Sequence, residues 1–277
     1  YQALAKSSNV EERFATFLAH EWTPSAGHGK PYHRVHWGHY VVVFPGFEGQ
    51  VMRANDQTAN LPERLFAEAR KQGDLMVIPH YHGTRPPVDP EISYALEIVA
   101  WDGKVSERET QAKKSAFSTL NEGYRLGMIG GVDHGAEGLT AHHNGEMFAV
   151  RADRFENDAI REGVKKRRTT AICHSRMLIG FWMNGQEMGS EVTVGAEEKR
   201  AFRVKVASKP YPARVSLIRN GETVYSYDNA GKGGANALEF EWTDDSTLDA
   251  EAWYMVKVVL HGGEQAWSSP IWAEAGS

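Results

Sequence analysis

The spacing of apolar residues changes near residue 183, and this change restricts the chain to a fold with two unlike parts. From about residue 188 onward, apolar and polar residues alternate in short segments at intervals of roughly ten residues, a pattern typical of β-sandwiches. Asn220-Gly221 separates two of these segments and favours a two-residue hairpin turn. We therefore predict an all-β sandwich domain over residues 184–277.

The first part, residues 1–183, mixes helical and strand signals. Strands predicted at 40–44 and 75–78 lie on either side of a helix predicted at 62–72, and the alternation continues to a strand at 170–172. Alternating strands and helices indicate βα units and a parallel sheet or barrel. The fold class predicted for the whole chain is therefore α/β followed by all-β.

The composition is that of an ordinary globular protein, which excludes several classes of function. Of the 277 residues, 41% are hydrophobic and 24% are charged, which excludes disorder and coiled coils. The apolar runs are far shorter than the roughly 20 residues of a membrane helix, and a formal charge of −5 argues against nucleic acid as a partner.

The single cysteine, Cys173, excludes an internal disulfide. It leaves the compartment open, and we favour a secreted or periplasmic location over a cytoplasmic one.

Histidines gather in the first half of the chain, and several stand at the ends of predicted strands. Glu21 and Asp133 accompany them. Histidine with carboxylate is a ligand set for zinc, manganese or iron, and several such ligands can hold more than one ion. The sequence therefore predicts a divalent-metal site. Ten of the twelve histidines lie between residues 20 and 143: His20, His28, His33, His36, His39, His80, His82, His134, His142 and His143.

Three further residues are candidates for binding substrate. His82 and Arg85 lie in a loop rich in glycine and proline, which suits the rim of a pocket. Arg85 either pairs with an anionic substrate or is simply solvated. Glu97 interrupts an apolar strand. It either accepts a hydrogen bond near the metal site, contacts substrate, or faces solvent at the strand end.

The predicted sandwich is rich in tryptophan. Aromatic side chains of this kind either stack on sugar rings, as in a carbohydrate-binding surface, or fill the sandwich core and its contact with the first part. The residues concerned are Trp242, Trp253, Trp267 and Trp272.

A series of short motifs between about residues 10 and 192 carries a family resemblance. The motifs are His20-Glu21-Trp22-Thr23, Gly38-His39-Tyr40, Val77-Ile78-Pro79-His80, Leu96-Glu97-Ile98, Ile129-Gly130-Gly131-Val132-Asp133-His134, Lys166 to Thr170, and Asn184 to Gly189. In their order and approximate spacing they resemble the later part of a PHP domain, of the polymerase and histidinol phosphatase superfamily of metal-dependent hydrolases.

That resemblance implies a distorted βα barrel, two or three divalent metal ions and hydrolysis of phosphate esters. It implies that Glu21 bridges two ions, that His39 and His80 are ligands of single ions, and that Asp133 and His134 form the last ligand pair. His80, Asp133 and His134 would also be the catalytic residues. The family's opening His-x-His motif is absent from this sequence, so the first strands would be missing or supplied by a companion chain.

The function predicted from the sequence is that of a metal-dependent hydrolase, a phosphoesterase that uses metal-activated water on a small-molecule substrate. Two alternatives remain open. One is a carbohydrate-active enzyme, either a lyase or a hydrolase, that acts on a glycan with the same metal cage. The other is a half-site chain that needs a companion polypeptide to complete its active site.

Overall fold

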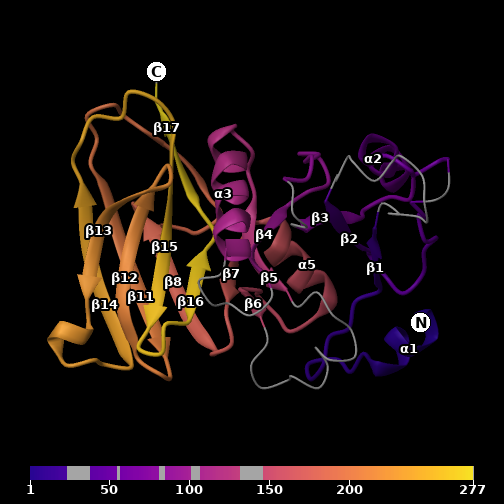
Figure 1. Ribbon diagram of the computed structural model, residues 1–277, viewed down its shortest axis with the longest axis horizontal. Helices are drawn as coiled ribbons and strands as arrows, with labels where there is room; N and C mark the ends of the chain where they lie inside the picture. The colour runs from indigo at the N-terminus through magenta and orange to yellow at the C-terminus, as the bar shows by residue number, and fades with distance from the viewer. Residues whose placement is uncertain (24–37, 55–56, 81–84, 101–106, 132–145, 277) are drawn as a thin grey trace.

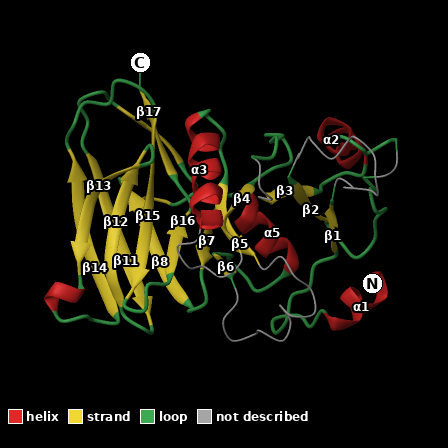
Figure 2. Ribbon diagram, viewed as in Figure 1, coloured by secondary structure: helices red, strands yellow, loops and turns green. Residues whose placement is uncertain are grey.

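The computed structural model describes residues 1–23, 38–54, 57–80, 85–100, 107–131 and 146–276. Within these ranges the strands form four open sheets, of three, two, eight and four strands, and none closes into a barrel. Figure 1 shows the sandwich strands at one end of the molecule and the three-stranded sheet at the other, and Figure 2 separates helices from strands. None of the described helices is long and apolar enough to cross a membrane.

The elements of the first part begin with α1 and end with β7. The helices are α1 (Gln2–Ser8), α2 (Pro62–Lys71), α3 (Glu107–Asn121) and α5 (Asn157–Lys165). The strands are β1 (Ala19–Trp22), β2 (His39–Val43), β3 (Met76–His80), β4 (Ala95–Ala100), β5 (Gly127–Gly131), β6 (Met147–Val150) and β7 (Thr169–Ile172).

The elements that follow are strands, with one short 3-10 helix, η2 (Ala230–Lys232). The strands are β8 (Met177–Met183), β9 (Gln186–Glu187), β10 (Glu191–Val194), β11 (Arg200–Ser208), β12 (Pro212–Arg219), β13 (Glu222–Asp228), β14 (Ala237–Asp244), β15 (Ala252–Leu260), β16 (Gln265–Ser268) and β17 (Ile271–Ala275).

Strands β1, β2 and β3 form an antiparallel sheet, and successive side chains of each strand alternate between its two faces. One face, which carries Trp22, Tyr40 and Val42, packs with α2 in a buried core. The other face carries His39 and His80, which are direct partners in the β2–β3 register. The sheet therefore brings two of the predicted metal ligands side by side.

The prediction of a parallel sheet or a distorted βα barrel is wrong for this sheet. Strands β2 and β3 are antiparallel although α2 lies between them in the sequence. Of the described strands of the first part, β4 and β5 alone form a parallel pair, joined through α3. A helix between two strands permits a parallel crossover but does not require one, since a long connection can return the chain in either direction. The described architecture is mixed α/β with open sheets.

The β-sandwich is confirmed. Its eight-stranded and four-stranded sheets share a core that includes Phe181, Phe202 and Tyr254. Asn220 and Gly221, with φ of 50° and 96°, form the predicted turn between β12 and β13. Strands β6 and β7 also join the larger sheet, through the pair of β7 with β16. Because that sheet takes strands from both predicted domains, the division at residues 183 and 184 stays a prediction.

The tryptophans of the sandwich lie mostly in its interior. Trp253, Trp267 and Trp272 are 2%, 4% and 0% exposed, and they pack in one cluster with apolar residues of α3, β4 and β5. Trp242 is partly buried against the sandwich core. Of the two alternatives weighed for these residues, the structure favours packing, and they lend no support to a carbohydrate-binding surface.

Gly189, which follows β9, packs closely against the main chain of Lys166, which precedes β7. Its φ is +90°, and a Cβ at this position would lie 2.1 Å from the carbonyl oxygen of Lys166. We expect Gly189→Ala to lower the free energy of unfolding by about 2–4 kcal/mol, because the left-handed backbone and the close contact both oppose a side chain. Urea denaturation measures the loss. The control is Gly185→Ala, where φ is +83° and the space is open. Losses of equal size would show that the contact with Lys166 contributes nothing.

Candidate functional site

The candidate site is built on the end of the three-stranded sheet where His39 and His80 meet. The two residues face each other across β2 and β3, and their ring centroids are 6.1 Å apart. Glu21 lies on the same face, because its strand partner is Val41, two residues beyond His39. Three candidate residues therefore share one face through strand register alone.

His39 is paired with Glu21. His39 Nδ1 lies 2.5 Å from Glu21 Oε1, and the side chains are 18% and 40% exposed. The hydrogen bond from His39 holds the pKa of the Glu21 carboxyl below its usual value, although partial burial opposes this shift. Positive charge on His39 or on His80 lowers this pKa further. Glu21 is therefore an ionised carboxylate that faces both imidazoles.

His80 is paired with Glu97 in the same manner. His80 Nδ1 lies 2.6 Å from Glu97 Oε2, and both side chains are buried. Glu97 comes from β4, which contacts β3 without belonging to its sheet. Gly131 at the end of β5 leaves room for this carboxylate, because a Cβ there would lie 3.0 Å from Glu97 Oε1. The burial of Glu97 excludes the solvent-facing alternative.

A cavity of about 410 Å³ opens beside these residues. Its described polar lining includes Glu21, His80 and Glu97, and the rest is largely apolar. Arg161, which the sequence analysis did not single out, lies buried in the wall and donates to the carbonyl oxygens of Phe44 and Asp74, at 3.0 and 2.5 Å. An arginine within a helix gives no sequence signal of such a position, because its partners are main-chain atoms distant in sequence.

The remaining predicted site residues are not brought to this cavity by the described structure. Arg85 donates to Ser118 Oγ at 3.1 Å and forms an ion pair with Glu122. His82, Asp133 and His134 lie outside the described residues. Within the described residues, no group of three or more His, Cys, Asp or Glu side chains is placed to hold a metal ion.

His20 belongs to the opposite face of the sheet. It follows Ala19 and precedes Glu21 in β1, so alternation places its side chain on the other face of the sheet from Glu21, although the residue is among those that line the cavity. Its ring packs against Phe44, with centroids 5.6 Å apart. Burial lowers the pKa of His20, although a hydrogen bond with the Met52 main chain opposes the shift. The structure gives His20 a packing role.

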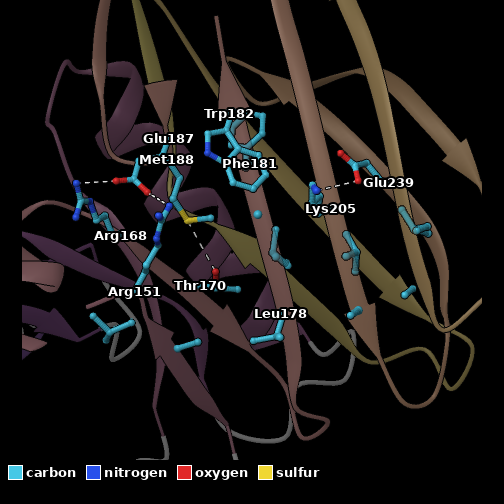
Figure 3. Close-up of a pocket in the computed structure, with 18 of the residues that line it drawn as sticks. Arg151, Arg168, Thr170, Leu178, Phe181, Trp182, Glu187, Met188, Lys205 and Glu239 are labelled. Carbon is cyan, nitrogen blue, oxygen red and sulfur yellow. Dashed lines mark hydrogen bonds and ion pairs between the residues drawn. The ribbon is translucent and has the colours of Figure 1, made fainter. Parts of the chain in front are cut away.

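A larger hollow of about 920 Å³ lies against the sandwich (Figure 3). Its described lining contains no His, Cys or Asp, and its two glutamates are held in ion pairs. Glu187 pairs with Arg168 at 2.6 Å, and Glu239 pairs with Lys205 at 2.9 Å. Among the described residues, the carboxylate–histidine pairs therefore lie at the smaller cavity and not at this hollow.

Comparison with known proteins finds distant relatives in Chlamydia. The chain is 28% identical over 144 residues to an uncharacterized protein of Chlamydia muridarum, covering 46% of this chain and 22% of the relative. It is 25% identical over 182 residues to an uncharacterized protein of Chlamydia trachomatis, covering 58% of this chain and 29% of the relative. The chain thus spans less than a third of the length of these relatives.

Two solved structures align with part of the chain, both with low TM-scores. One describes fibronectin(III)-like modules of Clostridium thermocellum CbhA, with 14% identity, a TM-score of 0.24, and coverage of 34% of this chain and 94% of that one. The other is a CARDB domain from Pyrococcus furiosus in complex with di-metal ions, with 8% identity, a TM-score of 0.26, and coverage of 37% and 89%. Scores this low carry no conclusion about this chain.

The resemblance to the PHP superfamily is not upheld. No family model matches the chain, and its relatives in Chlamydia are uncharacterized proteins. The described strands do not form the barrel that the resemblance implies. Short motifs that contain glycine are weak evidence of a shared family, because tight turns favour glycine in unrelated folds. The identification from motif order was therefore wrong.

Proposed function

We propose that the chain carries the catalytic site of a metal-dependent hydrolase that cleaves phosphoesters. One observation carries the proposal: two carboxylate–histidine pairs, Glu21 with His39 and Glu97 with His80, meet on the same side of the sheet beside a cavity. Histidines that bind metal commonly donate their other ring N–H to a carboxylate, which fixes the ring and raises its basicity.

The described residues supply part of a ligand set for a divalent ion, namely two imidazoles, and the remaining ligands would come from outside the described residues, where the predicted Asp133 and His134 lie. Nδ1 of each imidazole is engaged by a carboxylate, so Nε2 is the atom through which His39 and His80 would hold the ion. Glu21 is bonded to Nδ1 of His39, so in this arrangement its carboxylate orients that ring and does not itself reach an ion at Nε2 of the same ring. Zinc, manganese and iron all accept a mixture of imidazole and carboxylate. When bound, the ion activates water and neutralises charge on phosphoryl oxygens.

Other residues of the chain fix the positions of the two histidine rings. Glu97 fixes the tautomer and orientation of His80 from within the protein interior, and Glu21 does the same for His39 at the cavity mouth. The direct pairing of His39 with His80 in register sets the distance between the rings. His80 and Glu97 are buried, and burial strengthens the electrostatic interaction between them.

Metal titration of the purified chain tests the proposal. The chain is stripped with a chelator and titrated with Zn²⁺, Mn²⁺ or Fe²⁺, while bound metal and hydrolysis of 4-nitrophenyl phosphate are measured. Loss of a residue that only hydrogen-bonds to a metal ligand lowers metal affinity by roughly 10–100-fold. We expect His39→Ala and His80→Ala each to lower the affinity by more than this, because each removes a ligand itself. The control is His261→Ala, because His261 bonds to Tyr211 in the sandwich. Binding that is unchanged in both site variants would refute the proposal.

Native mass spectrometry of the isolated protein tests the predicted partner and the metal count together. A complex that holds two or three ions and a second polypeptide would support the half-site alternative. A single chain with bound metal and phosphoesterase activity would exclude the need for a companion.

A further inference from the structure

The walls of the cavity beside the two carboxylate–histidine pairs are largely apolar. Apolar side chains reach the cavity from the sheet, from β5 and β6, from α5 and from the segment before β1, and they include Phe17, Val41, Ile78, Ile129, Phe148 and Val164. Ile78 and Ile129 are buried in the core cluster behind the cavity, and Val41 packs against the same cluster. Apart from Phe17, these wall residues belong to strands and a helix, so the fold fixes most of the shape of the cavity.

Each charged side chain among the described residues that line the cavity already interacts with another group of the protein. Glu21 and Glu97 are engaged by the two histidines. Arg161 is the one cation among the described lining residues, and it donates to two main-chain carbonyls. An ionic group placed deep in the cavity would lose its hydration without gaining a partner from these residues, which is costly.

We infer that the substrate is amphiphilic: an apolar alkyl or aryl group fills the cavity, and the ester bond lies at the end where Glu21 and His80 stand. This inference rests on the proposed function and adds its substrate class. A volume of about 410 Å³ falls within the range of about 300–1,000 Å³ typical of small-molecule sites.

The reaction conserves atoms without any oxidant or reductant. The oxygen of water forms a bond to phosphorus and the bond from phosphorus to the leaving oxygen breaks. One proton of the water passes to the leaving oxygen, and the other stays with the phosphate product. In an alkyl 4-nitrophenyl phosphate the products are the alkyl phosphate and 4-nitrophenol. The alkyl group takes no part in the chemistry, so its effect on the rate reports binding in the cavity.

A chain-length series tests this inference with the full chain and metal ion. Alkyl 4-nitrophenyl phosphates from methyl to octyl are compared by kcat/KM. We expect a rise of up to about fourfold for each added methylene, as complete burial of each CH₂ predicts. Phe148→Ala should lower kcat/KM for the octyl ester by about tenfold and leave the methyl ester nearly unchanged. Phe155→Ala is the control, since Phe155 is 48% exposed, Phe148 is 42% exposed, and Phe155 is not in the described lining.

Binding of a neutral fluorescent probe, 1-aminoanthracene, separates the two proposals. Hydrolysis that does not depend on chain length would overturn the amphiphilic substrate and leave the hydrolase standing. No hydrolysis of either the diester series or 4-nitrophenyl phosphate, with one probe site that is weakened by Phe148→Ala and not by Phe155→Ala, would refute the hydrolase and retain the apolar ligand site. Absence of both hydrolysis and probe binding would overturn both.

Discussion

Replacing Glu97 by glutamine is expected to lower the affinity for the divalent ion by about 10–100-fold and to reduce hydrolysis in proportion. Glu97 is 3% exposed, and its Oε2 lies 2.6 Å from His80 Nδ1. Glutamine keeps the size and can still accept a hydrogen bond, but it removes the negative charge that raises the basicity of the imidazole. The loss should therefore appear in metal affinity, measured by competition with a chromophoric chelator.

The matched control for this change is Glu122→Gln. Glu122 is also a carboxylate paired with a basic side chain, Arg85, but it is exposed and is not among the described residues that line the cavity. We expect that variant to bind metal as the unmodified chain does. If Glu97→Gln also binds metal with unchanged affinity while remaining folded, Glu97 has only a packing role and His80 does not depend on it.

Much of the candidate site follows from local sequence rules. Alternation within strands places His39 on the same side of β2 as Val41 and opposite Tyr40, and the apolar run of β3 ends at His80. Prediction of the sandwich succeeded for the same reason, since period-two patterns and the Asn220-Gly221 turn report short-range geometry. Local signals of this kind need no knowledge of the rest of the fold.

Sheet topology was not predictable in the same way. Whether β2 and β3 run parallel or antiparallel depends on the path of the connection between them, which leaves little trace in residue periodicity. The pairing of Glu97 with His80 joins two strands that share no hydrogen-bonded ladder. For that reason the sequence left three roles open for Glu97, and burial was needed to exclude one of them.

The largest expected loss of stability comes from Asp244→Ala in the sandwich. Asp244 Oδ1 lies 3.1 Å from Arg200 Nη2, and the Arg200 side chain is 0% exposed. Tyr254 donates to Asp244 at 2.7 Å. Removing Asp244 leaves a buried guanidinium without its anion, which costs about 3–5 kcal/mol. Asp245→Ala, the exposed neighbour, should change the free energy of unfolding by about 0.5 kcal/mol or less.

The same carboxylate makes part of this stability depend on pH. Burial raises the pKa of Asp244, but hydrogen bonds from Ser246, Tyr254 and Arg200 outweigh it and lower the pKa from 3.8 to about 2. A lowered pKa means that the stabilisation is complete above pH 3.8 and is lost as the pH falls toward 2. The difference in unfolding free energy between the unmodified chain and Asp244→Ala should therefore be smaller at pH 2.5 than at pH 7, by about 2 kcal/mol. Urea denaturation at both pH values measures it, and a difference that does not change with pH would show that Asp244 stabilises the sandwich without its charge.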